Sequence, residues 1–287
     1  MSAMAVRGPE EFCLPRGYRQ QAAPLTHDGA RVVDERGEAT AYWSEARVRA
    51  SGRYQRHVYA WAAELVRSRG LKSVLDLGCG PCVKLMELIA PVCADVEGAD
   101  QASAIGVARG RGAGMPLREI DLERCAGVEA WRRFDLIVCA DVVEHLLDPD
   151  PMLGLIGRLS HEGTLVVMST PDRARLRGRG CMASEKPEHV REWAEGEFTA
   201  FLRSRGFAIE RVRRLPGDDA PWRRGAMREV VFRLGLAGSA ADRGCTAVCR
   251  GGGGRRLGRG GGRRGRGCAR RRRGERCWGI GGWRCRI

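Results

Sequence analysis

The most informative stretch of the sequence is Val74-Leu75-Asp76-Leu77-Gly78-Cys79-Gly80-Pro81-Cys82. An apolar run here ends in an acid and two spaced glycines, and a second apolar run follows at 83–89. This pattern predicts a buried strand, a tight turn and the start of a helix. Glycine lets the backbone of such a turn close on a ligand, and the N–H groups that open a helix favour an anionic group. We therefore expect a ligand to bind close to this turn.

Two kinds of nucleotide cofactor use a glycine-rich turn between a strand and a helix. A dinucleotide fingerprint has a third glycine three positions after the second, and Val83 holds that position here. The pattern Asp76-x-Gly78-x-Gly80 instead resembles the first motif of class I S-adenosylmethionine-dependent methyltransferases, which read acid-x-Gly-x-Gly-x-Gly. Cys82 stands at the third glycine of that family. We expect this departure to narrow the loop and to weaken cofactor binding.

The same departure creates Cys79-Gly80-Pro81-Cys82, which has the Cys-x-x-Cys spacing of a thioredoxin-type oxidoreductase. That motif usually follows Trp in a domain of about a hundred residues. Here it follows Leu-Asp-Leu-Gly within a longer pattern of alternating strands and helices. A turn that binds no ligand is the plainer alternative. We prefer the methyltransferase interpretation to both.

The net charge of the chain is concentrated near its C-terminus. Fifteen arginines and one glutamate fall within 243–287, so this segment carries nearly all of the net charge of +15. Fifteen glycines make up a further third of it, and few aliphatic residues remain to form a core. We expect a disordered tail over 243–287. Arg-Gly tracts can bind RNA through phosphate charge and arginine stacking.

The remaining composition indicates the setting and the other domain boundaries. Seven of the twelve cysteines lie ahead of the tail without a disulfide-like framework, and no stretch approaches a membrane span. We expect a soluble, cytoplasmic protein with no membrane partner. Residues 1–40 show no clear period and are expected to be a poorly ordered lead-in, followed by a methyltransferase domain over 41–242. The oligomeric state is left open.

Further strands are predicted at 94–100, 117–122, 134–140 and 163–171, followed by a looser pair at 207–215 and 227–236. Helical patterns lie between them. The order matches the methyltransferase family over roughly 54–236. The resemblance implies a Rossmann-like, doubly wound α/β fold with a seven-stranded sheet, parallel except for one antiparallel strand, and helices on both faces. A loop over the pocket mouth is expected at 173–193.

Asp100 ends the second predicted strand, 20 residues past Gly80. A carboxylate at this place accepts hydrogen bonds from both ribose hydroxyls, although it can equally cap the helix that follows. The resemblance implies that Asp121 accepts from the adenine amino group while the N–H of Leu122 meets a ring nitrogen; a surface acid is the plainer alternative for Asp121. The full set of predicted cofactor contacts is Asp76, Gly78, Cys79, Gly80, Asp100, Gln101, Asp121, Leu122 and Asp141.

The strand at 134–140 delivers Asp141-Val142-Val143-Glu144-His145 to the edge of the sheet where ligands of open α/β folds bind. This segment resembles the fourth motif of small-molecule methyltransferases, including those of ubiquinone biosynthesis. The motifs of amino-methylating and cytosine-carbon DNA enzymes are absent from this place. A sulfonium methyl group arrives already activated, so the protein mainly aligns the acceptor and excludes water. His145 is the candidate general base, with packing on the sheet as the plainer alternative.

The covering helices ahead of the first motif offer candidates for the acceptor pocket. In the resembling family such helices cover the substrate, so Tyr42, Trp43, Tyr54 and His57 are candidates to line it. The apolar stripe between 54 and 67 is also explained by plain packing against the sheet.

We therefore predict an S-adenosylmethionine-dependent methyltransferase that acts on an O, N or C atom of a small-molecule acceptor and has no resident metal. One alternative groups Asp141, Glu144, His145 and His189. Their spacing is similar to that of metal-dependent enzymes that methylate the 2′-hydroxyl at small-RNA 3′ ends, except that the first acid there is Glu. The other alternative is a non-catalytic RNA-binding protein on a degenerate methyltransferase fold.

Overall fold

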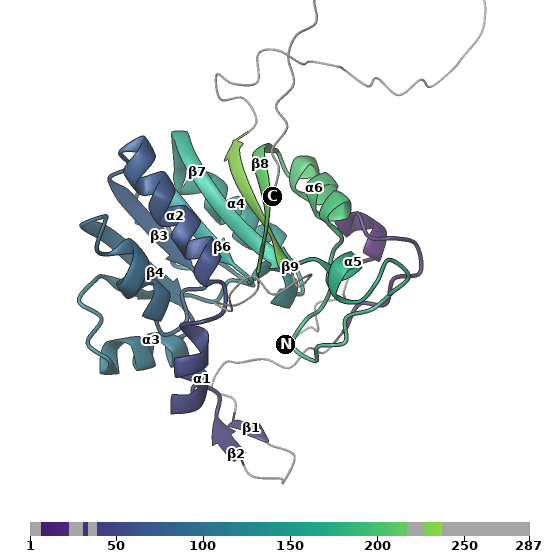
Figure 1. The fold of residues 1–287 in the computed structure, drawn as a ribbon, viewed down its shortest axis with the longest axis horizontal. Helices are drawn as coiled ribbons and strands as arrows, with labels where there is room; N and C mark the ends of the chain where they lie inside the picture. The colour runs from purple at the N-terminus through teal and green to yellow at the C-terminus, as the bar shows by residue number, and fades with distance from the viewer. Residues whose placement is uncertain (1–6, 23–30, 34–38, 217–226, 237–287) are drawn as a thin grey trace, which may run out of the picture. The chain divides into compact units, whose positions relative to one another are not determined.

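A seven-stranded sheet forms the centre of the computed structural model, which describes residues 7–22, 31–33, 39–216 and 227–236 (Figure 1). The strand order is β5-β4-β3-β6-β7-β9-β8. The strands are β3 (Ser73–Leu77), β4 (Asp95–Asp100), β5 (Leu117–Glu119), β6 (Phe134–Ala140), β7 (Ser160–Pro171), β8 (Phe207–Pro216) and β9 (Met227–Leu236). β9 runs antiparallel to both of its neighbours, and the other pairings are parallel. The predicted Rossmann-like sheet with one antiparallel strand is confirmed.

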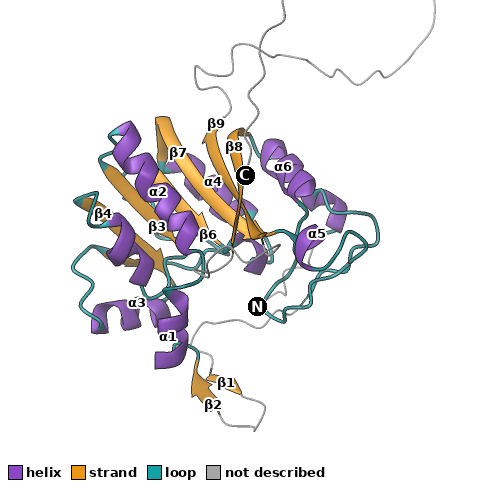
Figure 2. Ribbon diagram, in the orientation of Figure 1, coloured by secondary structure: helices purple, strands orange, loops and turns teal. Residues whose placement is uncertain are grey.

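Helices cover both faces of this sheet (Figure 2). They are α1 (Glu45–Ser51), α2 (Arg56–Arg69), α3 (Ala102–Gly110), α4 (Asp150–Arg158), α5 (Arg173–Leu176) and α6 (Glu195–Ser204). Leu75 and Leu77 of β3 pack in one core with α4 and α6, whereas Val74 packs in a second core with α2 and α3. Because successive side chains of a strand point to opposite faces, each central strand contributes to both cores. This explains why β3 and β6 are almost entirely buried.

The chain order across the sheet reverses at β3. From this strand the chain runs outward through β4 to β5, and it then returns to the other side of β3 to form β6 and β7. The loops that follow β3 and β6 therefore leave the sheet in opposite directions. A crevice at the carboxyl ends of the strands is expected at such a switch point, and ligands of doubly wound folds bind there.

The N-terminal segment differs from the expectation of a poorly ordered lead-in over 1–40. Residues 7–22 pack onto the domain through the 3₁₀ helix η1 (Pro9–Phe12), and Phe12, Leu14 and Tyr18 are buried. Trp193 Nε1 donates to the Phe12 carbonyl at 2.8 Å. Apolar residues in a short 3₁₀ turn show neither a helical nor a strand period, so periodicity did not reveal them. Farther along, β1 (Arg31–Val33) and β2 (Ala39–Ala41) pair antiparallel.

Two segments after the glycine-rich turn also differ in detail from the prediction. The helix expected at 83–89 is largely a π-helical turn, η2 (Leu85–Ile89), in which the Ala90 N–H donates to the Leu85 carbonyl five residues back. The loop predicted over 173–193 begins with the short helix α5, and its end at 189–193 is buried rather than exposed. Only part of that loop therefore covers the cavity described below.

The predicted tail over 243–287 lies outside the described residues, as does its suggested binding of RNA. Within the described part of the chain, no helix combines the length and the apolar character needed to cross a membrane.

Candidate functional site

A cavity of about 1350 Å³ opens at the carboxyl ends of β3, β4, β5 and β6. Its walls come from the turns after these strands, from α1 and the residues around it, and from the segment 186–188. Eight of the nine predicted cofactor contacts line it, namely Gly78, Cys79, Gly80, Asp100, Gln101, Asp121, Leu122 and Asp141, and the candidate base His145 lines it too. The exception is Asp76. The volume exceeds that of a typical drug-sized pocket, so the space is large enough for two ligands.

The turn after β3 depends on glycine at two positions. Gly78 has a φ of 79°, and a Cβ placed there would lie 2.3 Å from Cγ2 of Val142. Gly80 has a φ of 56°, and a Cβ there would lie 3.3 Å from Cη2 of Trp43. Both positions therefore require glycine for the backbone angle and for the close approach of a neighbour. The turn after β3 therefore packs between the loop after β6 and the segment before α1.

Asp100 connects this turn to the end of β4. Its Oδ2 accepts a hydrogen bond from the Gly80 N–H at 2.7 Å, and its Oδ1 accepts from the Gln101 N–H at 2.7 Å. Burial raises the pKa of Asp100 to about 6, although the two backbone hydrogen bonds favour the carboxylate. The helix-capping alternative for Asp100 is wrong, because Gln101 is the N-cap of α3, and the Asp100 carboxylate accepts from the N–H of Gln101 and from the glycine turn. The Asp100 side chain also lines the cavity.

Asp76 lies beneath the turn instead of in the cavity. Its side chain is fully buried, and Oδ2 accepts from the Tyr59 hydroxyl at 2.8 Å. Burial raises the pKa of Asp76 to about 7, and the nearby Lys84 acts against that shift. The contact ties α2 to the strand that carries the turn. The structure thus gives Asp76 a positioning role behind the loop, and a direct cofactor contact by its side chain stays a prediction.

Cys82 does not narrow the cavity as expected. Its side chain is fully buried, does not line the cavity, and packs against Cys79 and Gly98 in the core shared with α2. Its backbone has a φ of 59°, in the left-handed region where the family glycine is favoured. The substitution therefore costs backbone strain but leaves the ligand space open.

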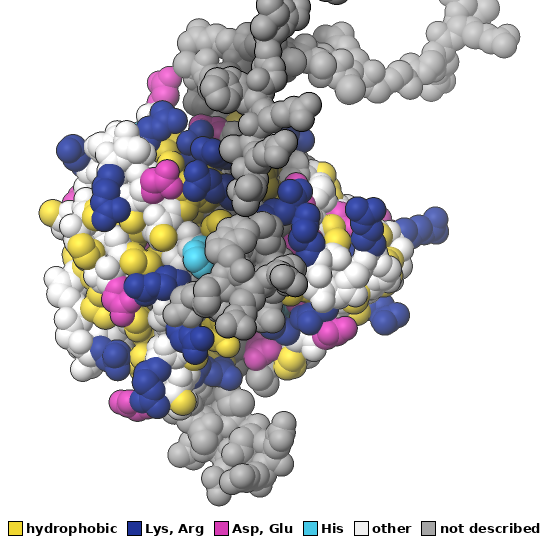
Figure 3. Space-filling view, in the orientation of Figure 1, with side chains coloured by type: hydrophobic (Ala, Val, Ile, Leu, Met, Phe, Trp, Pro, Cys, Tyr) yellow, Lys and Arg dark blue, Asp and Glu magenta, His cyan; other side chains and the backbone are white. Residues whose placement is uncertain are grey.

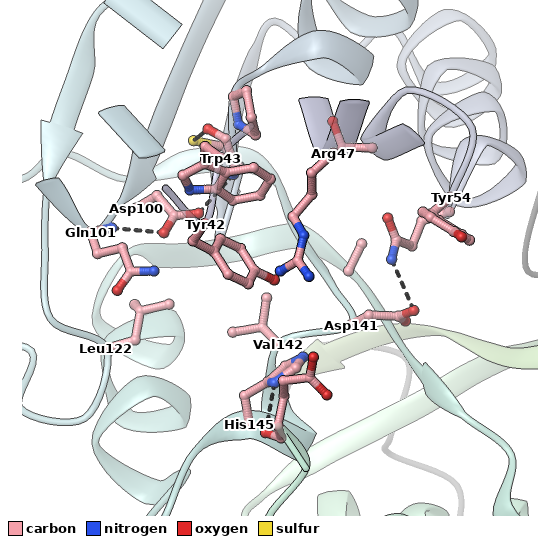
Figure 4. A pocket seen from close by; sticks show the side chains of 18 of the residues that line it. Tyr42, Trp43, Arg47, Tyr54, Asp100, Gln101, Leu122, Asp141, Val142 and His145 are labelled. Carbon is pink, nitrogen blue, oxygen red and sulfur yellow. Dashed lines mark hydrogen bonds between the residues drawn. The ribbon is translucent and has the colours of Figure 1, made fainter. Parts of the chain in front are cut away.

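The turn after β5 holds the remaining predicted contacts on this side. Asp121 is exposed, and its Oδ1 accepts from the Glu123 N–H at 2.9 Å. Leu122 is largely buried. Figure 4 shows Asp100, Gln101 and Leu122 on the same side of the cavity. These groups could hold a nucleoside between the β4 and β5 ends.

Asp141 lies on the opposite side of the cavity, next to the end of β6 (Figure 4). Its Oδ1 accepts from the Ser169 hydroxyl at 2.5 Å, and its Oδ2 accepts from Nε2 of Gln55 at 3.1 Å. Both Asp141 and Gln55 have a left-handed backbone, with φ of 54° each. Strained angles of this kind tend to cluster at functional sites. The contact fixes the start of α2 against the end of β6.

His145 follows the same strand, in the 3₁₀ turn η3 (Val143–His145). Its Nδ1 lies 2.9 Å from the carbonyl oxygen of Glu188. Because a carbonyl only accepts, Nδ1 carries the proton in this arrangement, and a neutral imidazole then has its lone pair on Nε2. This is the tautomer that a general base at Nε2 requires.

A buried cluster lies directly beside His145. The ligand atoms of Glu144, His145 and His189 all lie within 4.8 Å of one another. Glu144 is fully buried, its Oε2 accepts from the Thr170 hydroxyl at 3.2 Å, and its Oε1 has no hydrogen-bond partner among the residues that the structure describes. His189 Nδ1 lies 2.8 Å from Oε1 of Glu192. Three of the four residues in the predicted metal alternative are thus together, whereas Asp141 is outside the cluster.

The sequence indicated some of the acceptor side of the cavity and missed the rest. Tyr42, Trp43 and Tyr54 line it as predicted, and His57 does not. Arg47, Gln55, Lys84, Lys186 and Glu188 also line it and were not singled out. Cζ of Arg47 lies 3.9 Å from the centroid of the Tyr42 ring. Figure 4 shows both side chains in the space above His145. No short motif marks these residues, because they come from α1, from the residues just before α2 and η2, and from a distant loop.

The face of the molecule shown in Figure 3 carries charged side chains of both signs. Lys and Arg side chains are spread over this face, with Asp and Glu side chains between them. Among the described residues, several Arg side chains form ion pairs, such as Arg109 with Glu119 and Arg213 with Glu64.

The sequence matches the protein family described as a methyltransferase domain over residues 42–212, which is more than half of the chain. The chain belongs to this family. The expected resemblance to class I S-adenosylmethionine-dependent methyltransferases is therefore confirmed. An S-adenosylmethionine-dependent methyltransferase of known structure from Clostridium acetobutylicum ATCC 824 has the same fold, with a TM-score of 0.50 at 16% identity over 67% of this chain and 95% of that one.

Two curated relatives share a name. The ubiquinone biosynthesis O-methyltransferase of Bordetella avium is 32% identical over 118 residues, covering 39% of this chain and 48% of the relative. That of Sinorhizobium fredii is 36% identical over 130 residues, covering 44% of this chain and 50% of the relative. The chain thus spans about half the length of the curated relatives it matches.

The contact between Gly78 and Val142 yields a test of the turn. We expect Gly78→Ala to lower the free energy of unfolding by about 2 kcal/mol more than Gly112→Ala does. Both glycines have a left-handed φ, but a Cβ at Gly112 meets nothing within 4 Å, so the difference isolates the contact with Val142. Denaturant unfolding measures it. Equal losses for the two variants would contradict the close approach, whereas adding Val142→Ala to Gly78→Ala should recover most of the difference.

Proposed function

We propose that this protein transfers the methyl group of S-adenosylmethionine to an oxygen atom of a small aromatic acceptor. The observation that carries the proposal is the arrangement of Asp100 and the glycine turn on one side of a single cavity and His145 on the other. Membership of the methyltransferase family supports the cofactor, and the name of the curated relatives supports oxygen as the acceptor atom.

The cofactor would lie between the turn after β3 and the ends of β4 and β5. In this position the backbone at 78–80 meets its amino-acid part, the Asp100 carboxylate accepts from the ribose hydroxyls, and the turn at 121–122 meets the adenine. S-adenosylmethionine supplies an activated methyl group, and the chain supplies alignment and exclusion of water. Tyr42, Trp43 and α1 would close the cavity from the other side.

The acceptor would lie between Tyr42 and His145. Nε2 of His145 takes the proton from the acceptor hydroxyl as the oxygen attacks the methyl carbon, and the Glu188 carbonyl keeps the imidazole in the required tautomer. The aromatic side chains of Tyr42 and Tyr54 suit a flat ring, and the Arg47 guanidinium gives this part of the cavity positive charge. That charge favours a phenol that ionises during the reaction.

The pKa of Asp100 yields a pH test of cofactor binding. Since that pKa is raised to about 6, the carboxylate is present above pH 6 and is lost as the pH falls below it. We expect calorimetric affinity for S-adenosylmethionine to be about tenfold lower at pH 5 than at pH 7. Asp100→Asn should weaken binding at least tenfold at pH 7 and remove most of this dependence. The matched control is Asp95→Asn, an exposed acid at the other end of β4 and outside the cavity lining, which should bind like the unmodified protein.

Wild-type affinity in Asp100→Asn would contradict the ribose assignment. A pH dependence that persists in this variant would instead point to Asp76, whose pKa is raised to about 7.

His145→Asn tests the base. The asparagine amide can still donate toward the Glu188 carbonyl but cannot take a proton from the acceptor. We expect kcat to fall by about 100-fold or more, as is typical for loss of a general base, while calorimetric binding of S-adenosylmethionine stays within about twofold. An unchanged kcat would show that His145 is only a packing residue. Any O-methylated acceptor found by screening phenols with labelled cofactor serves for the assay.

A second candidate function is metal-assisted methylation of a ribose 2′-hydroxyl, such as that at an RNA 3′ end. The observation in its favour is the cluster of Glu144, His145 and His189, in which the buried Oε1 of Glu144 has no hydrogen-bond partner in the described part of the chain. Each histidine has an oxygen atom next to Nδ1, an arrangement common behind metal-binding imidazoles. A divalent cation held by this cluster would polarise a bound hydroxyl.

Chelation separates the two candidates. If His145 acts as a base, methylation of a phenolic acceptor should continue at the full rate after treatment with EDTA and gel filtration. If the activity is lost and Mg²⁺ or Mn²⁺ restores it, the metal-assisted candidate replaces the first. Glu144→Gln is the matched variant, because it removes a ligand charge from the cluster without touching the imidazole of His145.

A further inference from the structure

The turn after β3 contains two thiols in contact. The Sγ atoms of Cys79 and Cys82 lie 3.4 Å apart, and both side chains are buried. Elsewhere in the described residues, the buried thiols of Cys93 and Cys125 lie near carbonyl oxygens and that of Cys139 lies near the sulfur of Met152. The pair in the turn therefore stands apart from the other buried cysteines of the described chain.

The backbone at Cys82 and at Gly98 keeps the two sulfur atoms close together. Cys82 has a left-handed φ of 59°, which turns its side chain back toward Cys79. A Cβ placed on Gly98 of β4 would lie 3.1 Å from each Sγ atom, so both sulfurs rest on the same bare stretch of backbone. A disulfide has an S–S bond of about 2.05 Å, and the two Sγ atoms need to approach by roughly 1.3 Å to form one. That is a small movement for two side chains that already face each other.

The two thiols differ in access. Cys79 lines the cavity, whereas Cys82 lies behind it and is fully buried. A small reagent that enters the cavity therefore meets Cys79 first and finds Cys82 in reach of the same sulfur. This is the order needed for a reacting thiol and a resolving thiol. The contact with Cys82 and burial raise the pKa of the Cys79 thiol well above its ordinary range, so the reaction should accelerate as the pH rises.

We propose that Cys79 and Cys82 form a reversible dithiol–disulfide site that is oxidised by a hydroperoxide entering the cavity. In the first step the Cys79 sulfur attacks the terminal peroxide oxygen, the O–O bond breaks, and an alcohol or water leaves with a sulfenic acid on Cys79. In the second step the Cys82 sulfur attacks that sulfur, the S–O bond breaks, and water leaves with the thiol proton. Two thiols and one hydroperoxide thus give a disulfide, one alcohol and one water.

The disulfide would alter the cofactor loop. Cys82 is packed in the core, so closing the bond moves Cys79 and with it the Gly80 N–H, which donates to Asp100. This consequence, unlike the disulfide itself, rests on the proposed binding of S-adenosylmethionine at the turn. We expect oxidation to weaken that binding at least tenfold, and bound cofactor to slow oxidation by covering Cys79.

Peptide mapping of the full-length chain tests the disulfide. Trypsin cleaves after Lys72 and Lys84, and the peptide 73–84 contains Cys79 and Cys82 but no other cysteine. After treatment with hydrogen peroxide and then iodoacetamide, we expect this peptide to be unalkylated and lighter than its dithiol form by two hydrogens. Dithiothreitol should restore double alkylation. Cys13 and Cys181, half-buried in other peptides, report whether the peroxide dose oxidises thiols elsewhere in the described chain.

A peptide 73–84 that stays doubly alkylated while Cys13 or Cys181 is oxidised would overturn the proposal. So would irreversible oxidation of Cys79 to a sulfinic acid without a disulfide.

Calorimetry with S-adenosylmethionine tests the consequence for binding. Oxidation should weaken binding to the unmodified protein at least tenfold and leave binding to the double variant Cys79→Ala, Cys82→Gly unchanged; equal losses in the two would overturn the link to the loop. Glycine suits the left-handed backbone at position 82, so the double variant should fold. If the reduced protein does not bind the cofactor at all, the proposed function fails, and the peptide map still decides whether the disulfide forms.

Discussion

The Asp100 carboxylate holds the site together, because it accepts hydrogen bonds from the Gly80 and Gln101 N–H groups at the same time. These bonds join the glycine turn to the next strand. Burial disfavours the charged form of Asp100 and raises its pKa, and the two hydrogen bonds act against that shift. A polar ligand would stabilise such a buried carboxylate on the wall of a large cavity.

The opposite wall depends on contacts between segments far apart in the chain. The bond from Gln55 to Asp141 ties the start of α2 to the end of β6, and Tyr59 ties the same helix to Asp76 under the turn. The helices ahead of the first strand therefore do more than cover the sheet. They position the side of the cavity where the acceptor would bind, and Arg47 and Tyr42 extend from the neighbouring segment into it.

Some elements could be predicted from the sequence because local pattern and fold agree in them. β6 has the bounds expected from its apolar run, β9 has those expected from its loose alternation, and the spacing of Asp76, Gly78 and Gly80 was enough to find the turn. The direction of the Cys82 side chain could not be predicted, because it follows from a left-handed backbone and from the bare Gly98 beneath it. Phe12 and Gln55 were missed for a related reason: the partners Trp193 and Asp141 lie more than 80 residues away. Phe12 lies outside any periodic segment, and the apolar stripe that begins near Gln55 does not mark a polar side chain.

A crystal structure with S-adenosylhomocysteine bound tests the central claim most directly. The account predicts that the ribose hydroxyls lie within hydrogen-bond distance of the Asp100 carboxylate and that the amino-acid part follows the backbone at 78–80. The sulfur should then point across the cavity toward His145. A ligand bound elsewhere on the protein, or a ribose turned away from Asp100, would contradict it.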